Sequence, residues 1–186
     1  PHRIRQLAGR YVVFPAGGTN PIRTLTGAHL NPIIAHVKTL GLTPVFLGHK
    51  DGLANNGNAT MPDDIDFEGG VDLRSQTTIK EAAVIMQHAA CTVGIDGGLL
   101  HLATLMKDSR VVFGYNITSV EHREPRRSHG KTVNVYLTEA ELICSGCQSK
   151  WKHMVEHHFN KCYYEEGCAG WSAEHPERAR KCLTML

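Results

Sequence analysis

The sequence predicts an α/β domain with a doubly wound parallel sheet, followed by a cysteine-rich tail stapled by a metal ion. Two observations lead to this prediction. Short runs of β-branched and aromatic residues alternate with apolar residues at helical spacing through about residue 115, and five of the six cysteines gather in residues 144–182. The alternation is typical of βαβ units with parallel strands. We therefore divide the chain into an α/β domain, residues 1–137, and a tail, residues 138–186, which cannot build a core alone.

The first unit of the domain is a strand, a glycine-containing turn, a helix and a second strand. The strands are expected at Tyr11–Pro15 and Thr43–Leu47. The helix between them is expected to have Thr26 as its N-cap and to stop at Gly41. Residues 48–70 are rich in Gly, Asn and Asp, a composition that favours a long surface loop.

The alternation resumes after this loop. Thr78 and Glu81 form a capping-box pattern at the start of the next helix. Cys91 falls within an apolar run, so we interpret its thiol as part of the core. Ordered structure is expected to resume at Val71–Arg74. It is followed by a helix from Ile79, a strand at Cys91–Ile95, a helix at Gly98–Met106, and strands at Arg110–Phe113 and Thr132–Leu137.

Charge and hydropathy exclude several classes of protein. The chain has 20 Lys and Arg against 18 Asp and Glu, a net charge of +2, and no clustered basic face of the kind that nucleic-acid binding needs. No apolar run approaches the ~18–20 residues of a membrane span, and no secretory signal is visible. We expect a cytoplasmic protein, or one at the inner face of the membrane, with reduced cysteines available to a metal ion.

Residues 93–103 carry most of the chemistry. They lie at the carboxyl end of a predicted strand and open a predicted helix, where open α/β sheets bind ligands. Gly97 and Gly98 would let the backbone approach a bound group, and the helix N-terminus suits a diphosphate. Asp96 could hold a ribose or sugar hydroxyl, with His101 facing the same ligand. The alternative is a helix-capping Asp, glycines for tight packing and a core His.

Several segments together resemble the donor-binding signature of glycosyltransferase family 9, which contains the ADP-heptose:lipopolysaccharide heptosyltransferases. In one departure, Gly97 stands where the family usually has Ser or Thr, so a hydroxyl that could touch phosphate is lost while the backbone N–H remains. The resemblance covers residues 11–130 or so and rests on Asp72-Leu73-Arg74, Thr78–Ala83, Gly94–Gly98 with His101-Leu102-Ala103, and Phe113-Gly114.

The resemblance implies the C-terminal half of a GT-B glycosyltransferase, with a Rossmann-like fold that binds a nucleotide-diphosphate sugar, ADP-heptose first of all. The family transfers the heptose to a lipopolysaccharide or protein acceptor with inversion, using a base in its N-terminal domain. Only ten residues precede the first strand here. We therefore expect that acceptor domain to be missing from this chain or supplied by a partner chain.

The resemblance also implies roles for three loop residues. Thr19 would contact phosphate, and the catalytic Arg23 would neutralise charge on the departing nucleoside diphosphate. Asp51 would hold the ribose. A solvated loop arginine is the alternative interpretation of Arg23.

The tail forms a second constellation. Cys144-x2-Cys147 is followed by three single cysteines, a pattern that suits tetrahedral Zn²⁺ or an iron ion in a structural role. It resembles the cysteine finger of bacterial autotransporter heptosyltransferases, in which the ion is iron. Cys168 could replace Cys162, nearby histidines could also ligate, and unligated thiols or disulfides are the alternative. The ligands that this resemblance implies are Cys144, Cys147, Cys162 and Cys182, with Cys168 spare.

Two other classes of function are compatible with the sequence. A nucleotide-sugar-binding module without catalysis would carry the same Asp-Gly-Gly segment, and binding without turnover would identify it. A metal-stapled interaction protein would depend on the tail, so removing the tail should abolish partner binding and leave nucleotide binding intact.

Overall fold

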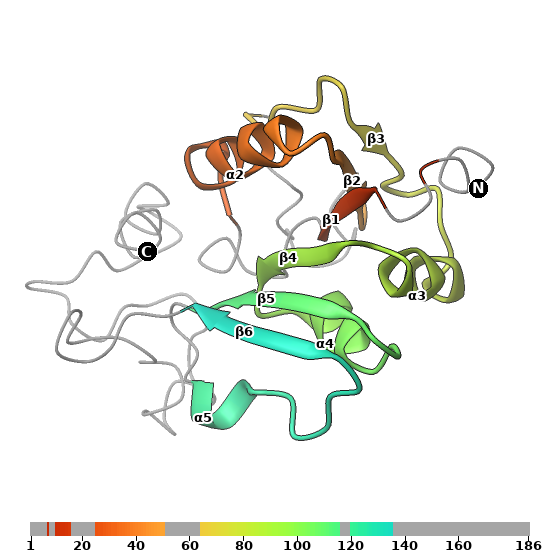
Figure 1. Ribbon diagram of the computed structural model, residues 1–186, viewed down its shortest axis with the longest axis vertical. Helices are drawn as coiled ribbons and strands as arrows, with labels where there is room; N and C mark the ends of the chain where they lie inside the picture. Colours follow the sequence, from red (N-terminus) through yellow and green to blue (C-terminus); the bar gives the residue numbers. More distant parts are fainter. Residues whose placement is uncertain (1–6, 8–9, 16–24, 51–63, 116–119, 136–186) are drawn as a thin grey trace, which may run out of the picture.

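Six parallel strands form one sheet, in the order β3-β2-β1-β4-β5-β6 (Figure 1). The computed structural model describes residue 7 and residues 10–15, 25–50, 64–115 and 120–135. The strands are β1 (Tyr11–Pro15), β2 (Thr43–Leu47), β3 (Val71–Asp72), β4 (Cys91–Ile95), β5 (Arg110–Gly114) and β6 (Lys131–Val135). The helices are α2 (Gly27–Thr39), α3 (Ile79–Gln87), α4 (Gly98–Thr104) and α5 (Val120–Arg123). The predicted parallel α/β sheet is confirmed.

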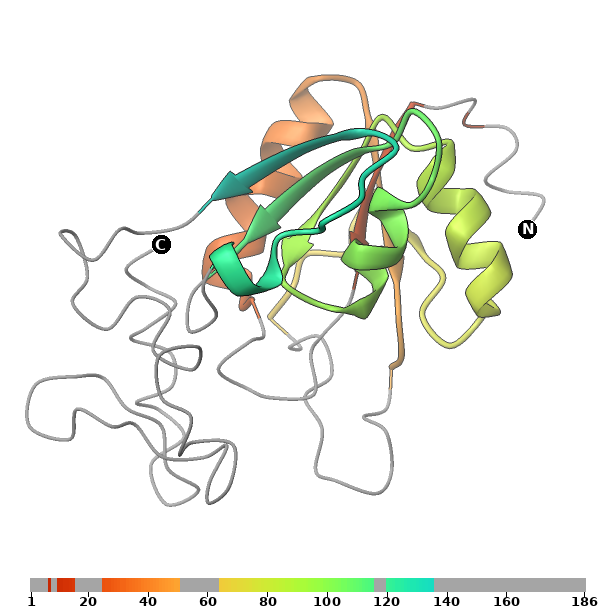
Figure 2. The same cartoon turned by 90° about the horizontal axis from the view of Figure 1, so that it is seen from below.

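Helices lie on both faces of the sheet, with α2 on one side and α3 and α4 on the other (Figure 2). The side chains of β1 alternate between the two resulting cores, as the period of a strand requires. Tyr11 and Val13 join the core beneath α3 and α4, whereas Val12 and Phe14 join the core beneath α2. Because both faces of β1 are buried, its sequence is a continuous apolar run rather than an alternating one.

Local signals set where two helices begin. Thr26 is the N-cap of α2, as predicted. In α3, Thr78 Oγ1 accepts a hydrogen bond from the Glu81 N–H at 3.3 Å, and the Glu81 carboxylate accepts one from the Thr78 N–H at 2.8 Å. The capping box expected from the sequence is therefore present. The helix predicted at Gly98–Met106 ends at Thr104 instead.

Part of the loop between β2 and β3 departs from the surface loop that its composition predicts. Ile65 is buried in the core beneath α2, and the Phe67 ring packs edge-on against Phe46 with centroids 4.7 Å apart. The Asn31 side chain donates to the Asp64 carbonyl at 2.9 Å and accepts from the Asp66 N–H at 2.8 Å. These hydrogen bonds satisfy the loop backbone and so allow its two apolar side chains to be buried.

Among the described residues, no helix is both long and apolar enough to cross a membrane. The predicted boundary at residue 138 and the cysteine-rich tail beyond it lie outside the described residues.

Candidate functional site

A buried carboxylate and a partly exposed imidazole form a pair at the carboxyl end of β4. Asp96 directly follows the strand, and its N–H donates to the Gly114 carbonyl at 2.9 Å. Its side chain is 1% exposed, and Oδ1 lies 2.8 Å from His101 Nε2. At this distance the carboxyl group and the ring nitrogen share a hydrogen bond. Asp96 thereby fixes the orientation of an imidazole that is 36% exposed.

Two aromatic side chains, Phe113 and Tyr115, pack next to this pair. The His101 ring lies 5.2 Å from the Phe113 ring, centroid to centroid, and Phe113 stacks on Tyr115. Tyr115 is 1% exposed, and its hydroxyl has no hydrogen-bond partner among the described residues. Burial raises the pKa of Tyr115, and the negative charges of Asp96 and Glu124 raise it further. A raised pKa keeps this hydroxyl protonated at neutral pH.

Gly94, Gly97 and Gly98 lie close to Asp96 in the sequence, and an added side chain would meet different surroundings at each of them. A Cβ on Gly94 would lie 2.9 Å from Leu100 Cδ1, so a side chain there would force the end of Leu100 in α4 to shift. A Cβ on Gly98 would meet nothing within 4 Å, and one on Gly97 would make only an ordinary contact with the Ile95 carbonyl. Gly97 has an extended backbone, with φ −169°, and neither it nor Gly98 has a positive φ.

Within the described residues, neither packing nor backbone conformation requires glycine at positions 97 and 98. Gly98 is exposed, and no atom of the described residues lies within 4 Å of the place that its Cβ would take. The tight-packing explanation applies to Gly94 alone. What glycine does provide at positions 97 and 98 is access to the backbone N–H groups for a group outside the chain.

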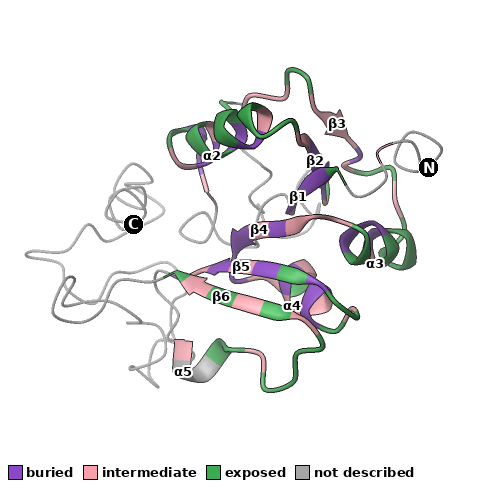
Figure 3. Ribbon diagram, viewed as in Figure 1, coloured by how far each residue is buried: buried purple, intermediate pink, exposed green. Residues whose placement is uncertain are grey.

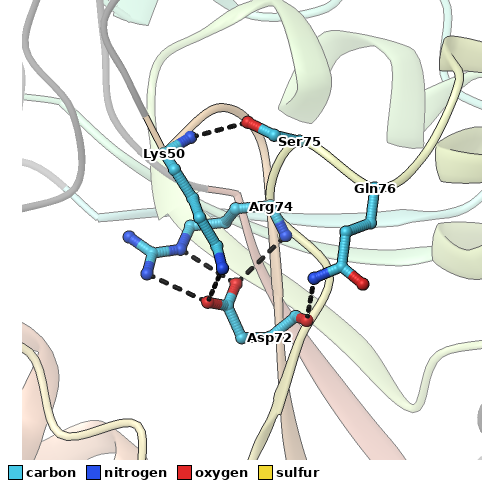
Figure 4. A network of polar contacts seen from close by, with 5 residues as sticks. All are labelled: Lys50, Asp72, Arg74, Ser75 and Gln76. Carbon is cyan, nitrogen blue, oxygen red and sulfur yellow. Dashed lines mark hydrogen bonds and ion pairs between the residues drawn. The ribbon is translucent and has the colours of Figure 1, made fainter.

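A second polar cluster lies at the carboxyl ends of β2 and β3 (Figure 4). Arg74 donates to both carboxylate oxygens of Asp72, at 2.9 and 3.1 Å, and Lys50 Nζ lies 3.3 Å from Asp72 Oδ2. The Arg74 guanidinium also lies 4.2 Å from the centre of the Phe67 ring. Burial acts to raise the pKa of Asp72, but the hydrogen bonds and charge of Arg74, with Lys50, outweigh it and leave that pKa lowered.

This cluster ties together the loops that follow β2 and β3. Ser75, with a left-handed φ of 58°, accepts a hydrogen bond from the Lys50 N–H at 2.9 Å and donates its own N–H to the Gly48 carbonyl at 2.7 Å. From the sequence, Asp72 and Arg74 were recognised only as part of a family signature. The signal that identifies their structural role is a pair of opposite charges two residues apart at the end of a strand.

The structure brings Asp96, Gly97, Gly98 and His101 together, and other predicted site residues lie outside the described part of the chain: Thr19, Arg23, Asp51, Cys144, Cys147, Cys162 and Cys182. Two of the loops concerned still have defined starting points. β1 lies between β2 and β4, with all three parallel. The loops after Pro15 and Lys50 therefore leave the same edge of the sheet as Asp96. The strand order reverses between β1 and β4. In open α/β sheets, ligands usually bind beside the carboxyl ends of the strands at such a point.

Within the described residues, no group of three or more His, Cys, Asp or Glu side chains is placed to hold a metal ion. Cys91 is a free, partly buried thiol of β4 that packs against the core beneath α2. Burial raises the pKa of the Cys91 thiol, as expected for a cysteine with a packing role.

Comparison with solved structures places the fold among glycosyltransferases. The iron-containing dodecameric glycosyltransferase TibC from enterotoxigenic E. coli H10407 matches with a TM-score of 0.63 and 21% identity, over 94% of this chain and 42% of that one. The E. coli ADP-heptose LPS heptosyltransferase II matches with a TM-score of 0.56 and 20% identity, over 74% and 42%. E. coli heptosyltransferase WaaC, solved with ADP, matches with a TM-score of 0.53 and 18% identity, over 69% and 38%.

The chain thus spans less than half the length of these proteins. No curated protein sequence matches it. The family model for glycosyltransferase family 9 (heptosyltransferase) matches residues 5–157, which include every described strand and helix. The chain therefore belongs to glycosyltransferase family 9.

Proposed function

We propose that this chain is the donor-binding half of a heptosyltransferase-like glycosyltransferase and binds a nucleotide-diphosphate sugar at the carboxyl edge of β1, β2 and β4. One observation carries the proposal: the fixed Asp96–His101 pair adjoins two glycines that nothing else in the described fold requires. Adenine is the preferred base, because TibC has been solved in complex with ADP-D-beta-D-heptose and WaaC with ADP.

In this proposal the backbone N–H groups of Gly97 and Gly98 approach the diphosphate. The His101 ring, held by Asp96 through Nε2, offers its other nitrogen to the sugar or the phosphate. Arg23 supplies a cation to the leaving nucleoside diphosphate, and Thr19 a hydroxyl to phosphate. Asp51 holds the ribose. It directly follows Lys50, whose N–H donates a hydrogen bond to the Ser75 side chain.

Transfer of the sugar also needs an acceptor site and a base that deprotonates the acceptor hydroxyl. We propose that a further domain or a partner chain supplies both, because this chain spans less than half the length of relatives with this fold. The acceptor would be a lipopolysaccharide or a protein. A cytoplasmic location stays a prediction.

Calorimetric titration of the chain with ADP, UDP and GDP tests donor binding. ADP should bind, and its Kd should rise at least about tenfold, or 1.4 kcal/mol, in Asp96→Asn, His101→Gln and Arg23→Ala. The matched control is Asp66→Asn, because Asp66 pairs with Lys38 near the end of α2, away from this edge. Equal affinities in all variants, or no binding of any nucleotide, would reject the proposal for this chain. Binding without turnover after an acceptor domain is supplied would indicate a non-catalytic module.

We also propose that Cys144, Cys147, Cys162 and Cys182 hold a structural zinc or iron ion. The support is the set of thiols and the description of TibC as iron-containing. Elemental analysis of the purified chain should find about one ion per chain. The role of this ion would be structural, because four protein ligands leave no coordination position open for a substrate. Cys162→Ser should lose that ion and Cys168→Ser should keep it; the reverse result would exchange the two ligands.

A further inference from the structure

The face of the sheet that carries α2 has no covering helix over β5 and β6 in the part of the chain that the structure describes. Val111 points toward the core beneath α4, so Val112 points to the opposite face, as do its register partners Val93 and Val133. Val133 is 57% exposed and Val135 46% exposed. Figure 3 shows β6 as a strand of exposed and intermediate residues. We call Val93, Val112, Val133 and Val135 the valine face.

The topology of the sheet explains why this face is open. Connections between parallel strands are right-handed, so a chain that moves from β3 across to β4, β5 and β6 places α3, α4 and α5 on one face only. Val120, the first residue of α5, packs against the core beneath α3 and α4 in agreement with this rule. The described helices that follow β3 in the succession of strands β1 to β6 therefore leave the valine face uncovered.

Two parts of the chain adjoin that succession. Leu7, just before β1, packs against the core on the α3 and α4 side, so it leads away from the valine face. Residues 136–186 follow Val135 directly, at the end of the edge strand that borders the valine face. Residues 51–63 fall between β2 and β3 in the sequence, and these two strands lie at the opposite end of the strand order from β6.

The sequence of residues 136–186 includes apolar side chains whose burial would be favourable. Trp151, Met154, Val155 and Phe159 follow one another at intervals of three, one and four residues, the spacing of one helical face. A segment of this length buries few apolar side chains by itself and depends on a staple or on a neighbouring surface to do so. The valine face offers β-branched side chains that are only half covered.

We propose that residues 136–186 dock on the valine face, so that the cysteine-rich tail and the sheet form a single folding unit. The proposal depends neither on a bound nucleotide nor on which cysteines hold an ion. It implies that contacts to the sheet, and not only ligation of an ion, hold the tail in place.

Photo-crosslinking of the full chain tests the proposal. Benzoylphenylalanine is placed at position 133 and, as the control, at position 84, because Val84 is 54% exposed on α3 at the opposite face. Position 133 should crosslink to peptides from residues 136–186 of the same chain, independently of protein concentration. Position 84 should give none of these products.

Limited proteolysis provides a second measurement. Val133→Asp should increase the cleavage rate within residues 136–186 by about tenfold, because cleavage follows the population of the undocked state. Val84→Asp should leave that rate unchanged. Crosslinks from position 133 to a second copy, an absence of crosslinks to the tail, or equal cleavage rates in the two variants would each overturn the proposal.

Discussion

Replacing Gly98 by alanine separates ligand binding from folding at the candidate donor site. The new methyl group would meet no atom of the described residues within 4 Å, and the backbone there has no positive φ. Since alanine restricts the unfolded chain more than glycine does, Gly98→Ala should raise the free energy of unfolding by up to about 0.4–1 kcal/mol. The same methyl group would occupy the space through which a phosphate reaches the backbone N–H groups. The Kd for ADP should therefore rise at least about tenfold, or 1.4 kcal/mol.

Gly94→Ala is the matched control, with the opposite expectation. Its Cβ would lie 2.9 Å from Leu100 Cδ1, in a core where Leu100 is 1% exposed. Overpacking of this kind costs about 1–3 kcal/mol, and the low end applies because the contact is with the end of a side chain. The folded Gly94→Ala protein should bind ADP with little change in Kd.

Two assays distinguish these outcomes: urea unfolding followed by circular dichroism for stability, and calorimetric titration with ADP for affinity. The reasoning fails if Gly98→Ala binds ADP as tightly as the unmodified chain does. It also fails if Gly98→Ala loses as much stability as Gly94→Ala, because Gly98 would then be a packing residue.

The remaining predictions concern stability. Asp72→Asn should lower the free energy of unfolding by about 1 kcal/mol at pH 7, since Asp72 loses its charge-assisted bonds to Arg74. The pKa of Asp72 is lowered in the folded state from the ordinary 3.8, so this stabilisation is present above that pH and is lost as the pH falls through the folded value. In urea titrations the gap between the variant and the unmodified chain should close in that acid range; a constant gap would contradict the ion-pair interpretation. Tyr11→Phe should cost about 1 kcal/mol, because the Tyr11 hydroxyl donates to the buried Ile85 carbonyl at 2.7 Å. Tyr115→Phe should cost nothing or stabilise, because that hydroxyl lacks a partner among the described residues, and equal losses in the two variants would show that it has one. Thr78→Ala removes the N-cap of α3 and should cost about 1 kcal/mol in thermal unfolding, whereas Thr77→Ala should be neutral; similar values for both would argue against the capping box.

The features that the sequence predicted well are those with local causes. The strand at Tyr11–Pro15 and the start of α3 at Thr78 follow from residue types within one short window. The place of Asp96 at the carboxyl end of β4 is equally local, because it depends only on where the apolar run of the strand stops. Position in the chain was enough to expect Asp96, Gly97, Gly98 and His101 close together.

The features that were missed depend on contacts between distant segments. The loop after β2 was expected at the surface, yet Ile65 is buried because Asn31 of α2 satisfies the neighbouring backbone. The tie between Lys50 and Asp72 exists because β2 and β3 pair in the sheet. Composition counts residue types within a window and carries no information about such partners.

The sequence by itself determined the succession of strands and helices, the family and the short segment that carries the candidate site. Only the tertiary structure decided what each glycine of that segment is for. Gly94 faces Leu100 across a packed interface, whereas Gly98 faces open space. Identical residues four positions apart differ in role because the space around a side chain is set by the elements that fold against it.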